Sequence, residues 1–207
     1  MTSYLRYLIT ATLFVLALGQ QAFADDDVVA PRVPPAIQMP SGHIPFLEGH
    51  AVGTQNYICL PSTAPSGVSW TLFGPQATLF FTFKVFNHEI QQQIMTHFLS
   101  ANPEENGTGR PTWQSSFDTS AVWGRAFASS LDLNFVAPGA IPWLLLQVVG
   151  TEHGPAGGDF LTQTTFIHRV NTTGGMAPPT GCSQSSNIGA TVLVPYTADY
   201  FFYKARR

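Results

Sequence analysis

The chain has 207 residues, of which 10% are charged and 13% are aromatic, and its formal net charge is −3 at pH 7 with histidine neutral. This composition excludes an intrinsically disordered chain, because its apolar and aromatic surface can offset the conformational entropy lost on folding. The slightly acidic balance, without a basic patch, also argues against a nucleic-acid partner.

Residues 1–24 predict a signal peptide. Arg6 precedes the apolar run of residues 8–18, and the segment ends in the small-x-small sequence Ala22-Phe23-Ala24. A helix rising about 1.5 Å per residue over that run would cover about half of a hydrocarbon core roughly 30 Å thick. We therefore expect an exported protein, periplasmic or extracellular, with no stable membrane anchor after cleavage.

Residues 25–42 form a proline-rich N-terminal tail, which favours extended backbone, and residues 43–207 are expected to form a single all-β domain. Within that domain, short runs rich in aromatic and β-branched residues alternate with turn residues, and no convincing helix separates them. The expected strand runs include residues 57–60, 69–73, 77–86, 111–115, 121–129, 141–149, 160–171 and 190–203. This pattern predicts an antiparallel β-sandwich or a closed β-barrel of about 8–10 strands, with at most one or two short helical turns.

Three segments carry more specific expectations. Residues 141–149 are nearly all apolar, which predicts a central strand buried on both faces, whereas residues 160–166 interleave threonines as a half-exposed strand would. Residues 87–95 are ambiguous between helix and strand, because the apolar positions around Ile90 and Ile94 match a helical face that Asn87 would cap. We expect a helical turn or loop there, followed by a strand over residues 93–99.

The chain has two cysteines, Cys59 and Cys182, and neither belongs to a C-x-x-C pair or a metal-ligand spacing. In the oxidising compartment that a signal peptide implies, the two predict a disulfide. Two buried thiols are the alternative.

Several sequence landmarks, in this order, resemble those of an uncharacterised family of exported proteins found in bacteria and filamentous fungi. They are Ala-Val-Gly-Thr-Gln-Asn-Tyr-Ile-Cys at residues 51–59, Pro-Thr-Trp at 111–113, Ile-Pro-Trp-Leu-Leu at 141–145, Arg-Val-Asn-Thr-Thr-Gly-Gly at 169–175 and Val-Pro-Tyr-Thr-Ala-Asp-Tyr at 194–200. The resemblance covers most of residues 42–203 and implies no activity. Some fungal relatives bear the label malate dehydrogenase, but this chain lacks a strand followed by G-x-G-x-x-G and a helix.

The chain departs from the pattern of that family between its histidine strand and its tryptophan strand. The resemblance implies a short turn there, followed by Asp-Gly-Ser. Here the turn is lengthened to residues 101–110, and Asp118-Thr119-Ser120 replaces the glycine form. The corresponding end of the sheet is therefore expected to differ in this member.

His97 and Trp113 would lie on neighbouring strands if residues 101–110 form a long hairpin connection, and such loops often carry function. Asp118, Glu104 and Glu105 would then supply carboxylates near the imidazole for acid or base chemistry. The competing interpretation, which we favour, is that Trp113 packs in the core and His97 hydrogen-bonds a loop carbonyl. We nevertheless place the candidate ligand site at this rim, with His97, Trp113 and Asp118.

Tyr196 and Asp199 complete the candidate ligand-binding set, because a carboxylate in an apolar strand needs a partner or water. A structural salt bridge from Asp199 to Arg169 is the alternative. No metal site and no cofactor are expected, since the six histidines form none of the common ligand motifs. No G-x-S-x-G nucleophile elbow is present either.

Taken together, these patterns predict an exported soluble binding module with its site near the rim formed by residues 96–120. The ligand would be a small molecule, a glycan or a protein. A hydrolase or isomerase using a histidine with an acidic partner is one alternative. A structural envelope or matrix protein without a pocket is another.

Overall fold

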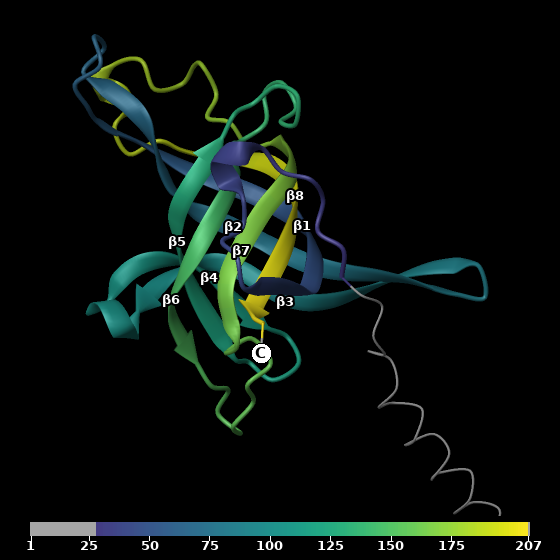
Figure 1. Cartoon of the computed structure of the whole chain (residues 1–207). Coiled ribbons are helices and arrows are strands. Elements are labelled where there is room, and N and C mark those ends of the chain that lie inside the picture. Colours follow the sequence, from purple (N-terminus) through teal and green to yellow (C-terminus); the bar gives the residue numbers. More distant parts are fainter. Residues whose placement is uncertain (1–27, 207) are drawn as a thin grey trace, which may run out of the picture.

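A computed structural model describes residues 28–206 as eight antiparallel strands closed into a barrel (Figure 1). The strands are β1 (His43–Pro61), β2 (Val68–Val85), β3 (His88–Asn102), β4 (Thr108–Ser115), β5 (Ala121–Ser130), β6 (Trp143–Glu152), β7 (Thr164–Gly174) and β8 (Thr191–Ala205). Each strand pairs with the next along the chain, and β8 returns to pair with β1. The expected all-β antiparallel fold is confirmed, and the barrel is the correct one of the two architectures. The predicted signal peptide lies outside the described residues.

The barrel closes because β1 is long enough to pair along both of its edges. It runs beside β2 from His50↔Phe80 to Pro61↔Val68 and beside β8 from His43↔Ala205 to Ile58↔Thr191. Closure leaves fewer unpaired strand edges, the feature that otherwise promotes edge-to-edge aggregation.

The barrel interior is filled by side chains of complementary size. Gly53, Ala77, His97 and Trp113 follow one another as direct cross-strand partners on β1 to β4, and Tyr196 of β8 pairs with Gly53 on its other side. A Cβ on Gly53 would collide with the backbone of β2 at Gln76 and Ala77. The small residues on β1 and β2 therefore leave room for the three large rings.

The described part of the N-terminal tail packs as a strap across the outer face of the barrel. It contains a single 3-10 turn, η1 (Pro35–Ile37), and the Ile37 side chain is fully buried. The strap forms a second core with outward side chains of β6 to β8, including Trp143, Leu145, Val170, Phe201 and Tyr203. β6 is therefore buried on both faces, as expected, because Leu146 packs in the barrel interior while Leu145 packs under the strap.

The expectation of a helical turn or loop at the start of residues 87–95 is wrong. Phe86 and Asn87 both have positive φ, 46° and 65°, which is the backbone of a two-residue hairpin turn, and β3 begins at His88. The pairs Val85↔His88 and Phe83↔Ile90 continue the ladder from there. Cross-strand pairing thus overrides the helical spacing of the apolar residues.

Several other strand limits differ from expectation, most of all that of β1, which spans His43–Pro61 where the expected run was residues 57–60. The runs 69–73 and 77–86 are one strand, because β2 continues through Gly74-Pro75 with a bulge opposite Asn56 and Tyr57. Residues 160–163 form a turn, held by bonds from Thr162 N to Asp159 O and from Thr164 N to Leu161 O, so β7 begins at Thr164.

The predicted disulfide is confirmed between Cys59 and Cys182, whose Cα atoms are 5.5 Å apart. It ties the end of β1 to the loop that precedes β8. The helical elements of residues 28–206 are three single 3-10 turns, one more than the expected maximum: η1, η2 (Pro103–Glu105) and η3 (Ser185–Asn187). Within the same residues, no helix has the length and apolar character needed to cross a membrane.

Candidate functional site

His97 and Trp113 do lie on neighbouring strands, but inside the barrel rather than at its rim. They are direct partners on β3 and β4, and their rings stack with centroids 4.2 Å apart. His97 Nδ1 donates a hydrogen bond to the Thr112 carbonyl, 2.8 Å away, and Tyr200 packs edge-on against both rings. The favoured core interpretation therefore describes the packing of both residues, but the carbonyl that accepts from His97 belongs to strand β4 and not to a loop.

The environment of His97 keeps its imidazole neutral. Burial lowers the pKa of His97 to about 3, the bond to Thr112 opposes part of that shift, and the positive charge of Arg169 adds to it. A general acid or base that acts near neutral pH needs a pKa near that pH. The pKa of His97 lies far below it, and the Nδ1 proton is held in the hydrogen bond to Thr112.

The three carboxylates expected beside His97 have other partners. Glu104 accepts a bond from Thr151 N at 2.8 Å, and Glu105 forms a two-point ion pair with Arg110, at 2.7 Å to Nε and 2.9 Å to Nη2. Hydrogen bonds from Arg110 lower the pKa of Glu105. Glu105 therefore holds the β3–β4 hairpin together, and Glu104 ties that hairpin to β6.

Asp118 holds two loops together. Its carboxylate accepts bonds from Ser120 N and Oγ and from Phe160 N, which ties the β4–β5 turn to the segment before β7. Burial alone would raise the pKa of Asp118, but these hydrogen bonds outweigh it and lower the pKa. A Cβ on Gly158 would lie 2.5 Å from the Asp118 Cβ, which explains why the facing loop is glycine-rich.

Tyr196 and Asp199 lie on opposite sides of the β8 wall. Tyr196 is buried inside, with its hydroxyl 3.3 Å from that of Tyr200. Asp199 lies outside, where it accepts bonds from His50 Nδ1 at 2.6 Å and Asn171 Nδ2 at 2.8 Å. The structure therefore places Tyr196 and Asp199 on different sides of the barrel wall.

The suggested salt bridge between Asp199 and Arg169 does not form, because Asp199 pairs with Val170 across the ladder while Arg169 pairs with Tyr200. One residue of register places the two side chains on opposite faces of the sheet. Arg169 instead donates to the Pro142 carbonyl at 2.8 Å.

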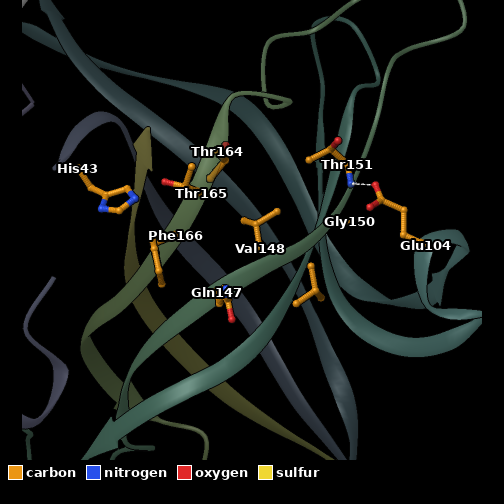
Figure 2. A pocket seen from close by; sticks show the side chains of 10 residues that line it. His43, Glu104, Gln147, Val148, Gly150, Thr151, Thr164, Thr165 and Phe166 are labelled. Carbon is orange, nitrogen blue, oxygen red and sulfur yellow. Dashed lines mark hydrogen bonds between the residues drawn. The ribbon is translucent and has the colours of Figure 1, made fainter. Parts of the chain in front are cut away.

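A groove that sequence reasoning missed lies where β6 and β7 diverge. The two strands pair at only four positions, ending at Gln147↔Phe166. Beyond that pair they enclose a groove of about 500 Å³, the β6–β7 groove, with His43 near one end and Glu104 near the other (Figure 2). The residues that line it are His43, Glu104, Gln147, Val148, Val149, Gly150, Thr151, Thr164, Thr165 and Phe166.

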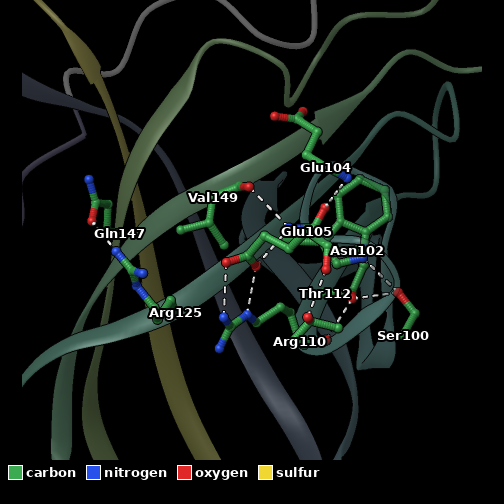
Figure 3. Close-up of polar contacts among 11 residues, drawn as sticks. Ser100, Asn102, Glu104, Glu105, Arg110, Thr112, Arg125, Gln147 and Val149 are labelled. Atoms are coloured by element: carbon green, nitrogen blue, oxygen red, sulfur yellow. Dashed lines mark hydrogen bonds and ion pairs between the residues drawn. The ribbon is translucent and has the colours of Figure 1, made fainter.

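The lengthened β3–β4 turn builds one end of this groove. Asn102 Nδ2 donates to the Val149 carbonyl at 3.0 Å (Figure 3), and Glu104 accepts from Thr151 N (Figure 2). Side chains of the turn therefore bond the β6 backbone where β7 has left it. Position 150 requires glycine, because a Cβ there would collide with the Asn102 side chain. The departure from the family pattern was the one sequence signal that pointed to this end of the barrel.

The side chains that line the groove can bind a ligand, but they do not form a recognisable catalytic arrangement. The lining includes the hydroxyls of Thr164 and Thr165, the Gln147 amide, the Glu104 carboxylate and the Phe166 ring, against which the His43 ring packs edge-on at 4.9 Å. His43 Nδ1 donates to the Pro40 carbonyl, which fixes the orientation of the imidazole. In residues 28–206, no group of three or more histidine, cysteine or acidic side chains is placed to hold a metal ion.

These observations define the molecule as an up-and-down β-barrel domain with an external groove. The family model described as "Protein of unknown function (DUF3455)" matches residues 40–204, and the chain belongs to that family. No curated protein and no solved structure gave a significant match.

Proposed function

We propose that this protein is an exported binding module that takes a small, polar ligand with an apolar face, such as a sugar, in the β6–β7 groove. The observation that supports the proposal is the divergence of β6 and β7 after Gln147↔Phe166, which leaves an open groove in the barrel wall. Its volume, about 500 Å³, lies within the range of small-molecule sites.

The chemistry of the lining supports this ligand class. Aromatic side chains bind the apolar faces of sugar rings, and Phe166 supplies such a surface. Threonine hydroxyls, an amide and a carboxylate also line the groove, so hydroxyl groups of a ligand would find both donors and acceptors. The groove also touches the predicted 96–120 segment, through Glu104.

Export is part of the proposal and is supported by two features. Residues 1–24 have the pattern of a signal peptide, and the Cys59–Cys182 disulfide is of a kind that persists in oxidising compartments. A periplasmic or extracellular location would give the groove access to sugars and other small solutes outside the cytosol.

Ligand binding by His97, Trp113, Asp118, Tyr196 and Asp199 stays a prediction. Binding at His97, Trp113 or Tyr196 would require a ligand to enter the packed barrel interior, because all three side chains are buried. The same obstacle faces a hydrolase or isomerase that uses His97. The groove needs no such rearrangement, and we therefore place the ligand there.

The test is native mass spectrometry of protein purified from its own compartment, to find small molecules that it retains. Gln147→Trp should fill the groove and abolish retention, since Gln147 lines it. Thr71→Trp, at an exposed position of β2, introduces the same side chain away from the groove and should retain the compound. Equal retention by both variants, with unchanged melting temperatures, would exclude the groove.

A further inference from the structure

The β2–β3 hairpin projects from the barrel as a two-stranded ribbon (Figure 1). β1 pairs with β2 only as far as Phe80, and β4 pairs with β3 only as far as Met95. Among the described strands, residues 81–93 therefore have no neighbour on either outer edge, and we refer to them as the β2–β3 arm. An isolated two-stranded ribbon is only marginally stable in water, so the side chains that this one exposes are a guide to its role.

The tip of the arm presents an aromatic ring at a conformational cost. Phe86 and Asn87 occupy the two central turn positions with φ of 46° and 65°, where Asn-Gly is the usual sequence. A bulky residue with positive φ is rare, because its side chain crowds the backbone. The Phe86 side chain is nevertheless 94% exposed, so the fold holds an uncovered ring at the outermost point of the arm.

The arm is amphipathic. Phe81, Phe83 and Val85 alternate onto one face, where the rings of Phe81 and Phe83 stack 6.2 Å apart and Ile90 lies opposite Phe83. Phe83, Val85 and Ile90 are 37%, 37% and 41% exposed.

The opposite face of the arm is polar. It carries Thr82 opposite Gln91, and Lys84 opposite Glu89, whose charged groups are 3.8 Å apart. The charged pair therefore lies on one side of the ribbon. The apolar surface lies on the other side, which also carries Gln92 opposite Phe81 and His88 opposite Val85, and at the tip.

We propose that the β2–β3 arm binds reversibly to the interface of a phospholipid bilayer, with its apolar face and Phe86 toward the acyl chains and its Lys84–Glu89 face toward water. Amphipathic helices that carry phenylalanine on one face and charge on the other lie in the interface plane in this way, with the apolar side buried about 5–10 Å, and the arm divides its two faces similarly. Unpaired backbone groups along both ribbon edges need water, so the arm must remain at the hydrated boundary rather than enter the hydrocarbon core.

The size of the exposed apolar area on the arm favours a lipid bilayer over a second copy of the chain as its binding partner. A stable protein interface buries about 800 Å² on each partner with complementary shape. Here one fully exposed ring and three side chains about two-fifths exposed provide the apolar contact. A bilayer needs no complementary shape, and such a small contact with it gives weak, reversible binding.

The experiment is co-sedimentation of the full chain with phosphatidylcholine vesicles, with and without phosphatidylserine. Phe86→Asn should lower the vesicle partition coefficient about tenfold or more, because burying a phenylalanine side chain contributes about 1.5–3 kcal/mol. The variant should fold at least as well as the wild type, since asparagine tolerates positive φ better. Phe73→Asn is the matched control, at a ring 64% exposed on β2 outside the arm, and should bind as the wild type does.

Three outcomes would overturn the proposal. The first is wild-type protein that does not sediment with either vesicle. The second is binding that Phe86→Asn leaves unchanged. The third is a concentration-dependent dimer that Phe86→Asn abolishes, in protein that does not bind vesicles. That result would show that the arm contacts a second copy of the chain. Retention of small molecules in the β6–β7 groove is independent of all three.

Discussion

The imidazole of His97 lies face to face with the indole of Trp113, with the ring centroids 4.2 Å apart and both side chains sealed inside the barrel. Because burial lowers the pKa of His97 to about 3, the unfolded chain binds a proton below its ordinary pKa of 6.5 that the folded chain excludes. The stabilisation from the neutral ring is complete above that pH and is lost as the pH falls from 6.5 toward 3.

From this we expect His97 to reduce the free energy of unfolding by about 2 kcal/mol between pH 7 and pH 5. Urea denaturation at both pH values measures the loss. His97→Phe keeps a ring on Trp113 but cannot titrate, so its pH dependence should be smaller by that amount. Equal pH dependence in the two proteins would show that His97 is protonated without cost. His168, whose pKa burial also lowers, contributes equally to both and cancels.

Gly53 sets how closely β1 approaches β2. A Cβ at this position would overlap Gln76 O and lie 2.5 Å from the Ala77 Cβ. Gly53→Ala should therefore destabilise the barrel by about 1–3 kcal/mol, by overpacking a filled interior. Thermal unfolding followed by near-ultraviolet circular dichroism reports it. Gly109→Ala is the control, since its nearest atoms are 3.8 Å away on Leu99, and it should change stability by much less.

Thr119 occupies a backbone conformation that suits glycine. Its φ is 59°, in the Asp118-Thr119-Ser120 turn. Thr119→Gly should stabilise the protein by about 1 kcal/mol, because relief of strain exceeds the added chain entropy. Thr119→Ala retains the Cβ and loses the γ-methyl group and the hydroxyl bond to the Asp118 carbonyl, so it should bring no gain. A glycine variant less stable than the alanine variant would contradict the strain argument. Both are compared by urea denaturation.

The Cys59–Cys182 disulfide closes a loop with a sequence separation of 123 residues. In the chain-entropy model, a loop of this length restricts the unfolded state by about 5 kcal/mol, which is an upper limit. Replacing both cysteines by serine should lower the free energy of unfolding by up to that amount. A reductant should destabilise the wild type to the same extent and leave the double variant unchanged. A wild type insensitive to reductant after unfolding would mean that the bridge does not constrain the unfolded chain.

Much of this architecture was accessible from local sequence. Alternating apolar and polar residues between turn clusters determine strands and exclude βαβ units, and two cysteines in a chain with a signal-peptide pattern predict one bridge. Even the neighbour relation of His97 and Trp113 followed from the hairpin between them. The strands and the hairpin depend on residues that are close in sequence. The disulfide could be predicted because two cysteines allow only one pairing.

The positions of the side chains relative to the barrel wall were decided only by tertiary structure. Whether His97 faces inward, and whether Asp199 can reach Arg169, depends on register, and one residue of register exchanges the two faces of a strand. The β6–β7 groove exists because two strands separate after Gln147, and the strap buries a face of β6 that periodicity cannot distinguish from the interior. Such contacts join segments far apart in the chain, so no local pattern specifies them.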